Sequence, residues 1–289
     1  MDPLEDFEEY EDDVGLGEED KKYAKGDRKQ WFKGEKGAAY RVAMMYFHPV
    51  TRAVVQAARK KNPEISREDL AKLVNQARGK RAEELGKPAD QLQEHELLNL
   101  DIAKFHRVEA HFKEGVGFAV SRLGKDGAEA DAIWQMMGDK KSYFCTVLLI
   151  YPCNREGEVN KEMLKAGNFD LKPWRLSAKV YGQLHQVAAG LRSNDLSIAT
   201  QDLILKCTNT DYQNFDIQPS GKALWRRIAA LQAAVLPKAV GLYKEMRSPF
   251  RELSTADLAI KLGVSTATGG GSQGSDVDAD DFDELLDQV

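Results

Sequence analysis

Four clusters in the sequence place aromatic side chains beside lysine or arginine on segments with strand character. Lysine and arginine neutralise phosphates, and aromatic faces stack on unpaired bases at roughly 1–3 kcal/mol per base. This combination is typical of a protein groove that binds single-stranded nucleic acid. A protein that recognises duplex DNA instead places a basic helix in the major groove of the DNA. The candidate nucleic-acid-binding residues are Arg28, Lys29, Trp31, Lys33 and Arg41; Lys140, Lys141, Tyr143 and Phe144; Lys172, Trp174 and Arg175; and Lys206, Tyr212 and Phe215.

Each cluster also has a purely structural interpretation, because an aromatic residue on a strand packs in a core more often than it faces a ligand. Tyr143 and Phe144 are neighbours on one strand and must point to opposite faces, so at most one of them faces the ligand. Trp134 and Trp225 have apolar neighbours at helical spacing and are expected in the core.

The sequence contains no complete catalytic or metal-binding motif. The sequence has no phosphate-binding loop, and His95 begins a zinc-protease pattern whose second ligand position holds Asn99. The C-terminal aspartates resemble a calcium loop, but Asp281 stands where glycine is needed and Asp287 where a bidentate glutamate is needed. We therefore expect a protein that is not an enzyme and that has no metal and no cofactor.

The charge is divided unevenly along the chain. The 289 residues carry 41 basic and 46 acidic side chains, a formal net charge of −5. Residues 1–20 hold 11 acids and residues 264–289 hold 7, with no lysine or arginine in either. Without these 18 acids, residues 21–263 have 28 acids against 41 bases, a net charge of +13. Such self-repulsion indicates a polyanionic partner.

The organisation follows from these shifts in composition. We expect a disordered acidic arm at residues 1–20, a body at 21–263, a flexible linker at 264–275 and an acidic tail at 276–289. The absence of regular strand–helix–strand units favours a mainly β fold with α insertions, a compact barrel. Predicted strands lie at 34–47, 108–123, 141–151, 169–178 and 201–217, and helices at 51–107, 127–138, 180–191 and 220–263, the last broken at Pro237 and Pro249.

The acidic tail carries apolar residues among its aspartates. On its linker it is expected to fold back over a cationic groove as a competitor for DNA, and to recruit partner proteins when DNA displaces it. A solubilising tail is the alternative, although solubility alone needs no apolar residues. The predicted partner-binding residues are Asp280, Asp281, Phe282, Asp283, Leu285 and Leu286.

Several segments, in order, resemble the single-stranded DNA-binding proteins of T-even and related large bacteriophages. They are GAAYRVAMMYFHP, KSYFCTVLLIYP, FDLKPWRLSAKVYGQLHQVAAGL, QDLILKCTNTDYQNFDIQPS and DADDFDELLDQV. The resemblance implies an OB-fold-like barrel with a helical insertion at 51–107 and a helical C-terminal part. It also implies a protein that coats single-stranded DNA in replication, recombination and repair. By position, Tyr143 and Phe144 match the aromatic pair of the central strand, and Tyr212 and Phe215 match those of the following loop.

The sequence departs from this family in two places. Members bind zinc through a His and three Cys in the insertion, whereas residues 49–107 contain no cysteine, so we predict no zinc. Members also associate along DNA through a basic N-terminal arm, whereas this chain begins with 11 acids, so self-association along DNA would need another route.

Three cysteines without a close pair indicate a reducing compartment, and no apolar run reaches the roughly 18 residues of a transmembrane helix. The start of the chain also lacks the pattern of a signal peptide. We expect a cytoplasmic protein, in the host cytoplasm if phage-encoded, that does not associate with membranes.

Two alternatives stay open from sequence alone, and a third finds no support in it. An RNA-binding or transcription-associated module would use the same groove. A protein-interaction scaffold would use the basic body to bind an acidic partner. A nuclease would need a cluster of acids on the strands, which the sequence does not offer.

Overall fold

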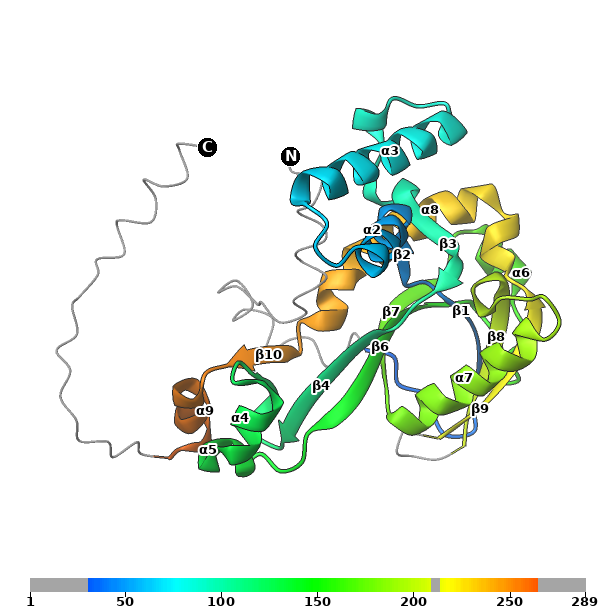
Figure 1. Cartoon of the computed structure of the whole chain (residues 1–289). Coiled ribbons are helices and arrows are strands. Elements are labelled where there is room, and N and C mark those ends of the chain that lie inside the picture. Colours follow the sequence, from blue (N-terminus) through cyan, green and yellow to red (C-terminus); the bar gives the residue numbers. More distant parts are fainter. Residues whose placement is uncertain (1–30, 209–213, 265–289) are drawn as a thin grey trace, which may run out of the picture.

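The computed structural model describes residues 31–208 and 214–264. Arg28, Lys29 and Tyr212 lie outside these ranges, as do the acidic arm and the tail residues predicted to bind partners. Within the described ranges the chain is mixed α/β with one large, mostly antiparallel sheet (Figure 1). Helices occupy more of these residues than strands do, so a mainly β class understates the helical part.

The large sheet has the order β10-β5-β4-β6-β1-β8-β9, and β7 pairs with the other edge of β6. Only the β10–β5 pair is parallel among these ladders. The strands are β1 (Ala39–Met44), β4 (His106–Lys113), β5 (Gly117–Ser121), β6 (Lys141–Ile150), β7 (Asp170–Leu176), β8 (Gln201–Cys207), β9 (Phe215–Lys222) and β10 (Phe250–Leu253).

Strand β6 is the centre of the sheet, and its nearly continuous apolar run suits a strand that is buried on both faces. On one edge its first half pairs with β4 and its second half with β1, in the registers His106↔Cys145 and Val42↔Ile150. Its other edge pairs with β7 from Phe144↔Leu176 onward. Tyr143 and Phe144 therefore lie on opposite faces of the sheet, as predicted.

The two faces of β6 pack into separate cores, because successive side chains alternate between them. Leu148 packs with Trp174 and with α7 (Ala178–Arg192). Val147 and Leu149 pack with Trp225 and with α8 (Ala229–Arg247). Trp134 and Trp225 are fully buried, which confirms their assignment to the core.

The described strands leave β7 and β9 without a shared ladder, and Phe32 occupies the space between them. Its backbone N–H donates to the Pro173 carbonyl at 2.9 Å. Its ring centre lies 5.7 Å from that of Trp174 and 6.2 Å from that of Phe215. Pro173 has no backbone N–H to donate to a ladder, which suits an edge, and the segment before β1 covers that edge.

The insertion after β1 begins as two helices, α2 (Val50–Lys61) and α3 (Arg67–Leu85), with a small apolar core of their own. Ser66 caps α3 by accepting from the Asp69 N–H at 3.1 Å, the contact that a serine three residues before an aspartate favours. These two helices agree with the expectation of short helices within 51–107, and only the end of the segment corrects it. After two short 3₁₀ turns, Ala89–Gln91 and Glu94–Leu97, the chain forms β3 (Leu98–Ala103), which pairs with β2 (Phe47–Pro49).

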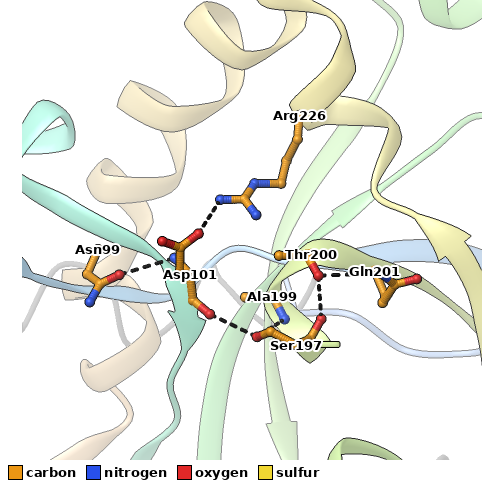
Figure 2. Close-up of polar contacts among 7 residues, drawn as sticks. All are labelled: Asn99, Asp101, Ser197, Ala199, Thr200, Gln201 and Arg226. Atoms are coloured by element: carbon orange, nitrogen blue, oxygen red, sulfur yellow. Dashed lines mark hydrogen bonds and ion pairs between the residues drawn. The ribbon is translucent and has the colours of Figure 1, made fainter. Parts of the chain in front are cut away.

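Polar contacts attach β3 to the rest of the body (Figure 2). The Ser197 hydroxyl donates to the Asp101 carbonyl at 2.8 Å, and the Arg226 guanidinium lies 3.0 Å from the Asp101 carboxylate. Ser197 also caps the short turn Ile198–Thr200 that leads into β8. The insertion is thereby fixed to the start of β8 and to the turn Leu224–Arg227.

The C-terminal part contains two differences from expectation. Helix α8 continues through Pro237, although an interior proline costs about 3 kcal/mol. Val235, Leu236 and Ala239 on either side of it are buried in the core, and this packing outweighs the missing hydrogen bond. After Pro249 the chain adds strand β10 before α9 (Thr255–Leu262), where only helix was expected.

Two short helices precede β6, at Gly124–Ala130 and Ala132–Gln135, and a third, Lys161–Lys165, precedes β7.

Candidate nucleic-acid interface

Aromatic rings gather on one side of the sheet around the first half of β6. The Phe118 ring centre lies 4.9 Å from that of Tyr143 and 4.8 Å from that of Phe112. The buried Phe250 ring packs against two of these rings, with its centre 5.1 Å from that of Phe118 and 5.8 Å from that of Tyr143. We call the surface formed by Trp31, Phe112, Phe118, Tyr143 and Arg175 the aromatic face.

Strand pairing explains why these residues share one side. Residues opposite each other in an antiparallel ladder point the same way. Phe112 pairs with Phe118, and Cys145 pairs with Arg175. Tyr143 lies two positions before Cys145 on β6 and so points to the same face. Four neighbouring strands therefore deliver their side chains to one surface.

Arg175 supplies a positive charge within this surface. Its guanidinium carbon lies 4.4 Å from the ring centre of Phe118 and 6.0 Å from that of Trp31. This is the geometry of a cation–π contact. The surrounding side chains partly desolvate the guanidinium and lower the pKa of Arg175, although the residue remains exposed to solvent on one side.

The rings of the aromatic face reach solvent to different degrees. Phe112 is 48% exposed, while Trp31, Phe118 and Tyr143 are half-buried. The tyrosine phenol is neutral at ordinary pH and does not repel a phosphate, and partial burial raises the pKa of Tyr143 further. A half-buried ring held by its neighbours costs little entropy when it stacks on a base.

The predicted cations lie at the surface. Lys33, Lys141 and Lys206 are exposed. The amine of Lys140 is 3.5 Å from Glu109, and that of Lys172 is 3.6 Å from Asp170. Exposed pairs of this kind are weak, so phosphates can replace the carboxylates at small cost.

Two predicted stacking residues belong to the core instead. Trp174 is 2% exposed and Phe215 is 3% exposed, with their rings 5.5 Å apart. Their strands turn these side chains inward, against Phe32, and no base could reach them without opening the fold. Their inclusion in the binding surface is therefore corrected: they support the sheet from inside.

Phe144 lies on the opposite side of β6 from the aromatic face. Its ring stacks on Tyr181 of α7 with centres 3.8 Å apart and planes 3° apart. Phe105 packs edge-on against Tyr181 at 5.1 Å. One face of the Phe144 ring is thus already occupied, which leaves Tyr143 as the member of the pair that lies on the aromatic face.

Arg41 also has a structural role in place of the predicted one. It lies 3.1 Å from the buried Asp202 carboxylate and donates to the Ser220 carbonyl at 2.7 Å. The Tyr151 hydroxyl donates to the same carboxylate at 2.9 Å. Burial raises the pKa of Asp202 to about 6, against the lowering effect of these hydrogen bonds and of Arg41. The group ties β1 to β8 and to the end of β6.

Sequence reasoning missed Phe112, Phe118 and Phe250. The first two flank the glycine turn of the β4–β5 hairpin, where Gly115 and Gly117 adopt left-handed φ angles of 86° and 91°. The sequence carries a signal for this turn, because Gly115 and Gly117 lie between two segments with strand character. Reading the register outward from it would have paired Phe112 with Phe118 across the hairpin.

Within residues 31–208 and 214–264, no group of three or more His, Cys, Asp or Glu side chains is placed to hold a metal ion. None of the helices in that part combines the length and apolar character needed to cross a bilayer. Comparisons with protein-family models, with curated proteins and with solved structures found no match.

Proposed function

We propose that this chain is a non-enzymatic, largely sequence-independent single-stranded DNA-binding protein of phage-type replication, recombination and repair. The observation that carries the proposal is the aromatic face, where the guanidinium of Arg175 lies over the ring of Phe118 and Tyr143 packs against the same ring. Stacking on rings and neutralisation of phosphate are the two interactions that unpaired DNA offers without regard to sequence. The net charge of +13 on residues 21–263 supports the same ligand.

The topology supports an OB-fold for the part of the sheet that carries this face. The order β7-β6-β1-β8-β9, with α7 between β7 and β8, is the order expected of a five-stranded OB unit whose strands in chain order are β1, β6, β7, β8 and β9, here without a ladder between β7 and β9. OB-folds bind oligonucleotides on their second and third strands and on the loop between the fourth and fifth. Tyr143 and Arg175 lie on the second and third strands of this unit, and Tyr212 belongs to that loop in sequence.

The tail completes the proposed function. Its aspartates compete with DNA for the basic body, and Phe282, Leu285 and Leu286 provide the apolar contacts that replication and recombination proteins would bind.

The test is fluorescence anisotropy of labelled oligo-dT, with a duplex of equal length and an oligo-U as competitors. The proposal expects oligo-dT to bind and the duplex to compete weakly, because the rings need unpaired bases. Equal competition by the duplex, or no binding of oligo-dT, would overturn it. Stronger competition by oligo-U would assign the same surface to RNA.

A further inference from the structure

The N-terminal arm enters the fold at the aromatic face. Trp31 is the first residue that the structure describes, and Arg175 lies over its ring. The next residue, Phe32, is fixed between β7 and β9 by its ring contacts and by the bond from its N–H to Pro173. Everything N-terminal to Trp31 is therefore tethered at the surface that is proposed to bind DNA.

The chemistry of the arm matches that of a single strand. Residues 1–20 carry 11 carboxylates, and Phe7 and Tyr10 stand among them. Carboxylates offer an anionic partner in place of phosphates to Arg175 and to Lys141, which lies two positions before Tyr143 on β6 and so shares its face. Aromatic rings offer Phe118 and Tyr143 stacking partners in place of bases. The described surface and the arm are therefore complementary both in charge and in aromatic character.

The tether is short enough for the arm to reach. Residues 21–30 separate the acidic segment from Trp31, and an extended stretch of this length spans at most about 35 Å. Segments joined by short links meet at effective concentrations on the order of millimolar. A weak complex between arm and face would therefore be well populated in the free protein.

We propose that residues 1–20 bind the aromatic face of their own chain and compete there with single-stranded DNA. This inference rests on the proposed function, and it gives the N-terminal acids a regulatory role separate from that of the C-terminal tail. DNA must displace the arm, so the arm lowers affinity most at low salt, where its ionic contacts are strongest.

The experiment uses the full chain with Glu8, Glu9 and Glu11 replaced by Gln. The matched control replaces three exposed acids of the helical insertion, Glu64→Gln, Glu68→Gln and Glu83→Gln, so that both variants change the net charge equally. Oligo-dT affinity is measured at low and at moderate salt. Acrylamide quenching reports the arm without DNA, because Trp134, Trp174 and Trp225 are almost completely buried and Trp31 is the tryptophan that solvent reaches.

The arm variant is expected to bind oligo-dT several-fold to about tenfold more tightly at low salt, an advantage that shrinks as salt rises. Its Trp31 should also become more accessible to acrylamide, and the control variant should change neither quantity by more than about twofold. Equal affinity and equal quenching in both variants would overturn the inference while leaving the proposed function intact. If no variant binds oligo-dT, the proposed function fails and this inference fails with it.

Discussion

Arg175 holds its guanidinium carbon 4.4 Å from the ring centre of Phe118, although β4 and β6 separate the strands that carry the two residues. In a flat sheet, three strand spacings of about 4.8 Å would separate the two strands by about 14 Å, and the residues are also offset along them, because Arg175 is level with His106 of β4 and Phe118 with Phe112. The side chains therefore lean toward each other over the strand that carries Tyr143. This relationship combines one cation and several rings in one surface, and the proposed function depends on it.

Replacing Tyr143 by Ala should weaken oligo-dT binding by roughly 1–3 kcal/mol, the value of one base–aromatic stack, or about 5- to 150-fold. Tyr143→Phe is the matched control, because it keeps the ring and removes only the hydroxyl, and it should stay within about twofold of wild type. Anisotropy titrations measure both, and thermal unfolding verifies that each variant folds. Equal affinities of Tyr143→Ala and Tyr143→Phe for oligo-dT would show that the Tyr143 ring does not stack on a base.

Replacing Arg175 tests charge separately from stacking. Arg175→Ala should reduce the salt dependence of binding by about one phosphate contact, that is, lower the slope of log affinity against log salt by about 0.7. Arg175→Lys restores the charge but not the planar guanidinium, so it should recover the slope and only part of the affinity. If both variants keep the wild-type slope, Arg175 does not contact phosphate.

Trp174 should behave as a core residue. Trp174→Ala removes a fully enclosed ring and should lower the free energy of unfolding by about 3–5 kcal/mol. Below its unfolding transition, the variant should keep most of its affinity for oligo-dT. Urea unfolding followed by binding at low temperature measures the two effects. A large loss of affinity for oligo-dT with unchanged stability would show instead that Trp174 contacts DNA.

The sequence was sufficient for features that depend on local chemistry. The apolar run of β6, the Ser66 cap and the amphipathic helix α7 all lie where their residues predict them. In the Lys172–Trp174–Arg175 segment, alternation required Trp174 and Arg175 to point to opposite faces. Alternation alone could not show which of these two faces of the strand is buried, because the helices that cover them, α7 and α8, come later in the chain.

The features that could not be predicted depend on distant partners. Strand β10 exists through a parallel ladder with β5, which lies about 130 positions earlier in the chain. Helix α8 passes through Pro237 because its buried face packs on β6 and β7. The local sequence predicts that the helix breaks at Pro237, but its tertiary packing keeps it continuous.

The pair of Arg41 and Asp202 predicts a pH-dependent stability. The pKa of Asp202 is raised to about 6 in the folded state, so the folded protein binds this proton more tightly than the unfolded chain does. Its contribution to stability therefore falls as pH rises from roughly 4 to 6, and above this range the buried carboxylate depends on Arg41.

Arg41→Met should lower the free energy of unfolding by about 3–5 kcal/mol at pH 8, because it leaves a buried charge unpaired. The loss should be smaller at pH 5, where the carboxyl can take up a proton. Adding Asp202→Asn to the same chain removes the charge and should restore part of the stability at pH 8. Equal losses from Arg41→Met at both pH values would contradict this account.

The central claim is that the aromatic face and the basic body bind single-stranded DNA through phosphates and bases together. The most direct measurement follows the fluorescence of Trp31 during titration with oligo-dT at several salt concentrations. We predict that its emission is quenched on binding and that log affinity falls linearly with log salt, with a slope of about −0.7 for each phosphate contacted. An unchanged emission, or an affinity that does not respond to salt, would contradict the claim.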